Sequence, residues 1–142
     1  EWGLSKFRIL WWGGGGTVLG ESPSGEGMPS AAKIAFSAVL PNRLTASDAA
    51  ENRRVIVCGM AGARQGGVKA GYINVPAPLA SILTGAVTVP GQSRDIRILP
   101  GLDQRDIPLP PVIRGYETPP PRPLGPPNQG PQTACMPGTH SN

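Results

Sequence analysis

The distribution of proline is the feature that most restricts how this sequence can fold. Eleven of the 35 residues from Pro108 to Asn142 are proline, and the run from Pro119 to Pro123 lacks the amide donors that a helix or an interior strand needs. We therefore expect polyproline and coil in this tail. The chain holds 20 Gly and 18 Pro among 142 residues, so its core has to lie upstream of the tail.

Hydrophobic periodicity upstream of the tail predicts strands that alternate with helices, which makes the expected fold class mixed α/β. The β-branched run from Val55 to Cys58 is expected to be a central strand covered on both faces. The glycine-rich block 62–71 follows it as a polar loop, a common place for ligand groups. The other expected elements are strands at 7–12, 17–19, 87–89 and 95–99, helices at 31–40 (ending before Pro41) and 78–86, turns at 13–16 and 100–101, and a loop at 20–30.

The charge pattern argues against a nucleic-acid partner. The 13 basic and 9 acidic residues give a net charge of +4, but the bases are scattered and Arg53–Arg54 is the one adjacent pair. This mild excess favours small anionic ligands. The apolar runs are much shorter than the roughly 20 residues of a membrane-spanning helix, so no membrane partner is expected.

The cysteines and the single histidine limit the possible metal sites. Cys58 and Cys135 are far apart in the sequence, which supports neither a disulfide framework nor a four-ligand zinc site, and we expect a cytoplasmic protein. His140 alone cannot build a site of several imidazoles. Because the chain begins with Glu1 rather than Met and stops just after a Gly-Thr-His turn, we expect it to be an excerpt of a longer reading frame.

Two glycine-containing segments are candidates for phosphate binding. The run 13–16 lacks the Lys-Ser/Thr of a P-loop and does not open a helix, so we interpret it as a hairpin turn. The segment 1–8 places an acid, a glycine and a hydroxyl at the start of a strand–turn–strand, where they could hold Mg²⁺ and present amides to a phosphate. The alternative for 1–8 is a frayed terminus with a packed Trp2.

Five segments taken together resemble the 2-dehydro-3-deoxygalactonokinase family in order and spacing. They are Glu1-Trp-Gly-Leu-Ser-Lys-Phe-Arg8, Gly59-Met-Ala-Gly-Ala-Arg-Gln-Gly66, Ile98-Leu-Pro-Gly-Leu102 with Arg105-Asp106, Arg114-Gly-Tyr-Glu-Thr118, and Met136-Pro-Gly-Thr-His-Ser141. The resemblance implies an actin-like sugar kinase of two ribonuclease-H-like lobes that transfers the ATP γ-phosphate, with Mg²⁺, to the 6-hydroxyl of 2-dehydro-3-deoxy-D-galactonate. It further implies a first lobe on the sugar-acid side at 1–118, a Pro-rich insertion or linker at 119–134, and the truncated start of the second lobe at 135–142.

The resemblance also implies a role for particular residues. It assigns the metal to Glu1, the phosphates to Gly3, Ser5, Gly138 and Thr139, the sugar acid to Arg64, Gln65 and Arg114, and the deprotonation of the attacking hydroxyl to Glu117. The sequence departs from the family pattern at Glu1, Leu4, Gly67, Lys69 and Tyr116, and prolines replace the helix expected after Glu117. Without a complete second lobe, we expect little activity from these residues alone.

Two other interpretations stay open at this point. In one, the chain is a non-catalytic α/β fragment whose segment 120–127 docks onto an aromatic groove of an SH3- or WW-type partner. In the other, the gene is frameshifted or decayed in its last third, although the family-like segment 136–141 speaks against a permanent shift. The binding of a sugar acid would favour the kinase interpretation over both.

Overall fold

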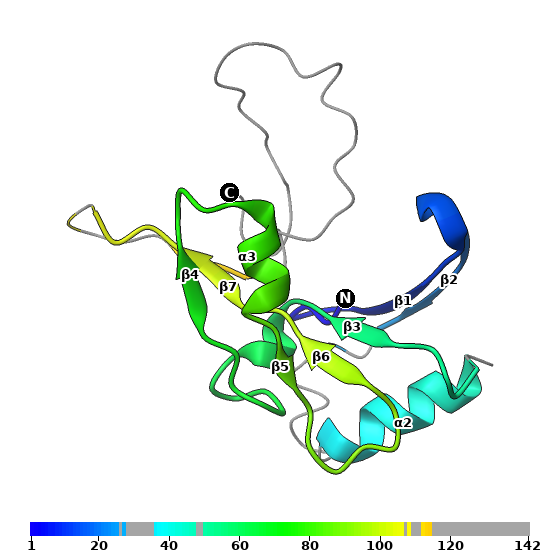
Figure 1. The fold of residues 1–142 in the computed structure, drawn as a ribbon. Coiled ribbons are helices and arrows are strands. Elements are labelled where there is room, and N and C mark those ends of the chain that lie inside the picture. Colours follow the sequence, from blue (N-terminus) through cyan, green and yellow to red (C-terminus); the bar gives the residue numbers. More distant parts are fainter. Residues whose placement is uncertain (26, 28–35, 48–49, 107, 109–111, 115–142) are drawn as a thin grey trace.

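A computed structural model describes residues 1–25, 27, 36–47, 50–106, 108 and 112–114 of the chain. These residues form two α-helices and three small sheets, which confirms the mixed α/β class (Figure 1). The elements in chain order are β1 (Phe7–Trp12), η1 (Gly14–Gly16), β2 (Val18–Ser24), α2 (Phe36–Ala46), β3 (Val55–Val57), η2 (Met60–Gly62), β4 (Tyr72–Asn74), α3 (Leu79–Thr84), β5 (Val87–Thr88), β6 (Ile96–Ile98), β7 (Gly101–Asp103) and β8 (Val112–Ile113).

The predicted N-terminal hairpin is present and longer than expected. Strands β1 and β2 pair antiparallel, and the glycine run turns the chain between them, with Gly15 and Gly16 at φ 80°. The prediction of a loop from residue 20 is wrong for 20–24, which continue β2 opposite β1. Both strands of a two-stranded ribbon are edges, so the polar residues and Pro23 are tolerated there.

Helix α2 contradicts the prediction that a helix ends before Pro41. Residues 31–35 lie outside the described part of the chain, and the helix runs from Phe36 through Pro41 to Ala46. Leu40 and Leu44, one turn apart, are both buried in the core. Burying two leucines is worth about 3–6 kcal/mol, which is enough to offset the roughly 3 kcal/mol cost of an interior proline.

The sheet β3–β6–β5 has β6, and not β3, at its centre. Strand β3 is parallel to β6, and β5 is antiparallel to it. The expectation that Val55 to Cys58 forms a central strand covered on both faces is therefore wrong: β3 is an edge of this sheet, and Ile56 is 50% exposed. The β-branched run predicted the strand correctly. It did not predict the place of this strand in the sheet, because the neighbouring strand β6 lies about 40 residues later in the sequence.

The third sheet, β4–β7–β8, was not predicted. Strands β4 and β7 are parallel, and β8 is antiparallel to β7. Gly101 opens β7 instead of closing a turn, and Val112–Ile113 forms a strand within the expected coil; the Pro-rich segment beyond it lies outside the described residues. In Figure 1, α3 lies beside the two three-stranded sheets, and a Cβ at Gly85, which ends α3, would lie 3.1 Å from Ile73 of β4 and 3.2 Å from Pro100.

One hydrophobic cluster joins the hairpin, α2 and the sheet β3–β6–β5. Trp2, Ile96 and Ile98 are its largest fully buried side chains, and Trp2 packs edge-on against Phe7 with ring centroids 4.9 Å apart. Its other buried members are Leu40, Leu44, Val57, Ala61, Ala70 and Val89. The packed Trp2 of the frayed-terminus alternative is thus confirmed, whereas the fraying is wrong, because the amides of Trp2 and Gly3 are hydrogen-bonded.

The burial of Trp2 predicts a large stability difference between two tryptophan variants. Trp2→Ala should lower the free energy of unfolding by about 3–5 kcal/mol, because it empties a fully buried site. Trp12→Ala, at a side chain that is 44% exposed, should cost much less. Urea unfolding followed by circular dichroism measures both, and equal losses would contradict the described core.

Candidate functional site

The N-terminal turn and the loop after β3 are joined backbone to backbone. The Trp2 amide donates to the Cys58 carbonyl at 2.9 Å, and the Met60 amide donates to the Trp2 carbonyl at 2.7 Å. Gly59 sits at φ +94°, and a Cβ there would lie 2.5 Å from the Trp2 oxygen, so only glycine fits. Segments 1–5 and 59–66, which the sequence analysis singled out separately, therefore form one unit.

The turn itself places its predicted phosphate and metal residues at the surface. The Gly3 amide donates to the Lys6 carbonyl at 2.9 Å and is thus occupied within the turn, while Ser5 is exposed. The Glu1 carboxylate pairs with Arg8, and this hydrogen bond is the main reason why the pKa of Arg8 is raised. Arg8 also lies 3.5 Å from Glu21 of β2.

The described residues do not fit a complete Mg²⁺ site. Within the ranges that the structure describes, three or more carboxylate, His or Cys side chains nowhere gather in a group that could hold a metal. Glu1 offers one carboxylate, but a cation would have to displace Arg8 from it. We therefore derive no step through a metal bound by these residues.

The loop after β3 folds tightly and leaves its polar tip exposed. The turns of residues 59–66 are closed by the amide of Ala63 donating to the Met60 carbonyl at 3.0 Å and by the amide of Gly66 donating to the Ala63 carbonyl at 2.9 Å. A Cβ at Gly66 would lie 2.0 Å from the Ala61 oxygen, so the tight path requires glycine. Arg64 and Gln65 are exposed and free to meet a ligand.

The side chain of Arg114, the residue after β8, packs against Gly62 of this loop and against the residues that follow the loop. Its Nη2 donates to the carbonyls of Ala70 (2.9 Å) and Gly71 (3.2 Å), and its guanidinium carbon lies 4.4 Å above the Tyr72 ring. A Cβ at Gly62 would lie 2.5 Å from its Nη1, so the glycine makes room for the guanidinium.

Two donor atoms of the Arg114 guanidinium have no partner among the described residues. Nε and Nη1 are buried, and among the described residues neither has a hydrogen-bond acceptor. Buried donors of a cation are costly to leave unsatisfied unless an acceptor, above all an anion, meets them. Nε and Nη1 point to different sides of the guanidinium, so each would have to meet an anionic oxygen separately.

A second polar group lies on the same face of the sheet as the Tyr72 ring. Asp103 ends β7, is 8% exposed, and accepts a hydrogen bond of 2.7 Å from Arg105 Nε on its Oδ2. Its Oδ1 is buried without a partner among the described residues. The Asn74 side-chain oxygen, at the end of the neighbouring β4, accepts a bond of 3.0 Å from the Arg105 amide.

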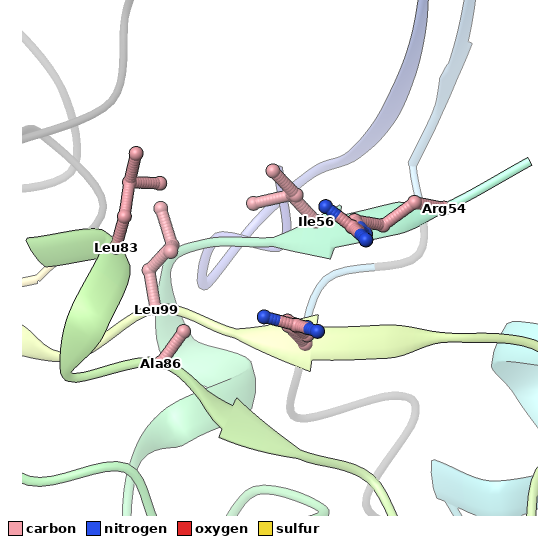
Figure 2. Close-up of a pocket in the computed structure, with 6 residues that line it drawn as sticks. Arg54, Ile56, Leu83, Ala86 and Leu99 are labelled. Atoms are coloured by element: carbon pink, nitrogen blue, oxygen red, sulfur yellow. The ribbon is translucent and has the colours of Figure 1, made fainter.

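A surface pocket lies on the outer face of β3 and β6, opposite the core side chains (Figure 2). Ile56, Leu83, Ala86 and Leu99 supply its apolar wall, and Arg54 and Arg97 supply its polar wall. Both arginines are held by Asp95, through Arg54 Nε at 2.7 Å and Arg97 Nε at 3.0 Å. None of the predicted site residues lines this pocket, so it is separate from the site described above.

The structure thus brings some predicted site residues together and leaves others outside its description. Glu1, Gly3 and Ser5 are joined to the loop that carries Arg64 and Gln65, and Arg114 packs against the start of the same loop. Glu117, Gly138 and Thr139 lie outside the described residues. Sequence reasoning missed Tyr72 and Asp103; the one available signal for Asp103 was an acid placed directly after an apolar strand end.

The fold and this site define a mixed α/β protein in which a glycine-rich loop lies against the guanidinium of Arg114, two of whose donors have no partner among the described residues. The sequence model of the 2-keto-3-deoxy-galactonokinase family matches residues 1–142, so the chain belongs to this family. It is 49% identical, over 99% of its own length, to Probable 2-dehydro-3-deoxygalactonokinase DgoK1 of Rhizobium meliloti (strain 1021).

A solved structure supports the same assignment. The crystal structure of a protein from Sinorhizobium meliloti that carries the name 2-dehydro-3-deoxygalactonokinase superposes with a TM-score of 0.81 at 46% identity, covering 99% of this chain. The chain spans 46% of the length of each of these two relatives. In the described part of the chain, neither helix has the length and apolar character that would let it cross a membrane.

The Asp95 pair predicts a pH-dependent contribution to stability. Hydrogen bonds from Arg97 and then Arg54 hold the pKa of Asp95 below its ordinary value of 3.8. A lowered pKa in the folded state means that the contribution is present above about pH 3.8 and disappears as the pH falls through the folded-state value.

The check is the melting temperature of wild type and Asp95→Asn between pH 6 and pH 2.5. We expect the wild type to melt higher near pH 6 and the two curves to converge in acid. A gap that stays constant over this range would contradict the described ion pairs.

Proposed function

We propose that the chain is the sugar-acid-binding part of a kinase that transfers the γ-phosphoryl group of ATP to the 6-hydroxyl of 2-dehydro-3-deoxy-D-galactonate. The observation that carries the proposal is the pair of buried, unpartnered donors of Arg114, Nε and Nη1, on a guanidinium that is stacked on Tyr72. The family membership of the whole chain supports the choice of substrate.

Arg114 is suited to hold the carboxylate of the sugar acid. Its free donors carry a full positive charge, and each can give a carboxylate oxygen a charge-assisted hydrogen bond. The two carbonyl bonds of Nη2 and the Tyr72 ring fix the guanidinium plane before the ligand arrives. Arg64 and Gln65, exposed on the same loop, would then contact the ligand from the solvent side.

The reaction that we propose needs an in-line displacement. The O6 oxygen of the sugar acid forms the new bond to the γ-phosphorus, the bond between that phosphorus and the β–γ bridging oxygen breaks, and ADP leaves. The hydroxyl proton passes to a carboxylate, for which we propose Glu117. Kinase chemistry calls for ATP and Mg²⁺; the metal would neutralise the phosphates and enter with the nucleotide.

The remaining assignments are also proposals. We propose that Gly3 and Ser5 approach the ATP phosphates from this lobe, that Gly138 and Thr139 do so from the start of the next, and that Glu1 offers the metal a single carboxylate, which pairs with Arg8 in this structure. We further propose a ribonuclease-H-like first lobe at 1–118, a linker at 119–134 and the start of a second lobe at 135–142. The TM-score of 0.81 to a kinase-named structure supports this lobe architecture.

Because the chain spans 46% of its relatives, we expect its 142 residues to bind the sugar acid without turning it over. The alternative of an SH3- or WW-type binding tail concerns residues outside the described part, and no described contact favours it.

The proposal predicts that the geometry of Arg114 governs sugar-acid affinity. Arg114→Lys should raise the dissociation constant for 2-dehydro-3-deoxy-D-galactonate roughly ten-fold or more, because a lysine keeps the charge but loses the stack on Tyr72 and the carbonyl bonds that fix the guanidinium. Gly62→Ala should have a similar effect by pushing the guanidinium off Tyr72.

Gly71→Ala is the matched control, because a Cβ at Gly71 would meet no atom within 4 Å. It should leave the affinity unchanged. Isothermal titration calorimetry with the whole chain measures all four proteins, and an Arg114→Lys variant that binds as tightly as the wild type would contradict the proposed carboxylate site.

A further inference from the structure

Trp2 is paired with residues of two different sheets. It forms isolated bridges with Phe7 of β1, antiparallel, and with Gly59 just after β3, parallel. Glu1 extends the first pairing, because its ammonium donates to the Arg8 carbonyl at 2.8 Å and the Arg8 amide donates to the Glu1 carbonyl at 2.9 Å. The first two residues therefore lie where a strand between β1 and β3 would end.

Strand β3 has an open edge on the side away from β6. The Val55 amide donates to the Asp95 carbonyl at 2.9 Å and the Val57 carbonyl accepts from the Leu99 amide at 2.8 Å, so both valines bond toward β6. Successive residues of a strand turn their backbone groups to opposite edges, so the amide and carbonyl of Ile56 point away from β6. Within the described part of the chain, no strand pairs with β3 on that side.

Strand β1 has a matching open edge. It pairs with β2 along one side, and Arg8 exchanges its backbone hydrogen bonds with Glu1 on the other. The alternation along the strand directs the amides and carbonyls of Leu10 and Trp12 to the same edge as those of Arg8. No strand of the described residues meets them there. A single extended segment that runs into Glu1 would bond to both open edges, antiparallel to β1 and parallel to β3.

The side chains beside these edges are buried only at the end where the first residues lie. Phe7 and Val57 on the inner face are each 4% exposed. Ile9 and Val55, which follow on the same face of β1 and β3, are only partly buried although they pack against the core. On the outer face, Ile56 is 50% exposed. A strand between β1 and β3 would cover all three of these more exposed side chains.

We propose that the open edges of β1 and β3 form a docking surface for one extended strand, a segment that leads into Glu1 from its N-terminal side. The Glu1 nitrogen lies at the entrance, between the hairpin and β3, and already makes the hydrogen bond to Arg8 that a strand amide would make (Figure 1). The occupant joins the hairpin to the sheet β3–β6–β5. Because it runs directly into the turn that carries Gly3 and Ser5, it also holds that turn against the loop after β3.

The two bridges of Trp2 set the register of the occupant. Each of the three residues before Glu1 lies between one residue of β1 and one of β3, which are, in order away from Glu1, Ile9 and Val57, Leu10 and Ile56, and Trp11 and Val55. The first and the third residue share the face of Trp2 and point to the core, whereas the second points outward. We therefore expect apolar side chains at the first and the third residue before Glu1.

Two N-terminal extensions of the whole chain, equal in composition, test this docking surface. The in-phase extension, Thr-Val-Thr-Val before Glu1, turns its valines to the core, and the out-of-phase extension, Val-Thr-Val-Thr, turns its threonines there. The in-phase extension should raise the melting temperature above that of the unextended chain by roughly 3 °C or more, because it buries two valines and completes both edges. The out-of-phase extension should leave it nearly unchanged.

Amide hydrogen exchange gives a second readout at the edges themselves. The in-phase extension should slow the exchange of the Leu10 and Ile56 amides roughly ten-fold or more, because both amides gain an acceptor. The out-of-phase protein, with the same added residues, is the control. If neither extension changes the melting temperature and the exchange of these amides, or if both extensions change them equally, the docking surface is refuted.

Discussion

The arrangement of the candidate site depends on the burial of Trp2. This side chain is 0% exposed, and its two backbone hydrogen bonds, to Cys58 and Met60, continue the edge of β3 with the first residues of the chain. The position of Gly59 at φ +94° is fixed by the same contact. The segment 1–5 is thereby held against the loop 59–66, because leaving the cluster would expose the large aromatic surface of Trp2.

The unpartnered polar atoms of the site lower the free energy of unfolding, and the rest of the fold has to offset this loss. Among the described residues, Arg114 and Asp103 together bury three polar atoms without partners, and the other buried side chains there are apolar. Native structures seldom leave such atoms unsatisfied, and those that do so concentrate them where a ligand binds. The described core, with Trp2, Ile96 and Ile98 fully buried, supplies the stability that this arrangement needs.

Local patterns were sufficient to predict the elements whose signal lies within a few residues. The glycine run after an aromatic strand predicted the hairpin, and short β-branched or apolar runs predicted β3, α3, β5 and β6. The same reasoning failed where a distant partner decides. Residues 20–24 became strand because β1 lies opposite, α2 passed through Pro41 because Leu40 and Leu44 are buried, and β6 took the centre of its sheet.

The sequence was sufficient to predict individual site residues, but not how their side chains lie relative to one another. Family resemblance selected Arg64, Gln65 and Arg114, but the stacking of Arg114 on Tyr72 and its contact with Gly62 join positions more than 40 residues apart. Strands of two or three residues, such as β4, β7 and β8, have too short a period to stand out in a sequence. The positions of Tyr72 and Asp103 near Arg114 could therefore be recognised only from the register of those strands.

Amide hydrogen exchange tests the central claim, that Trp2 locks the N-terminal turn to the loop after β3, most directly. The account predicts that the amides of Trp2 and Met60 exchange as slowly as those of the central strand β6, since all of them open only when the core unfolds. Rapid exchange at Trp2 and Met60 beside slow exchange in β6 would contradict it, because the turn would then open independently of the core.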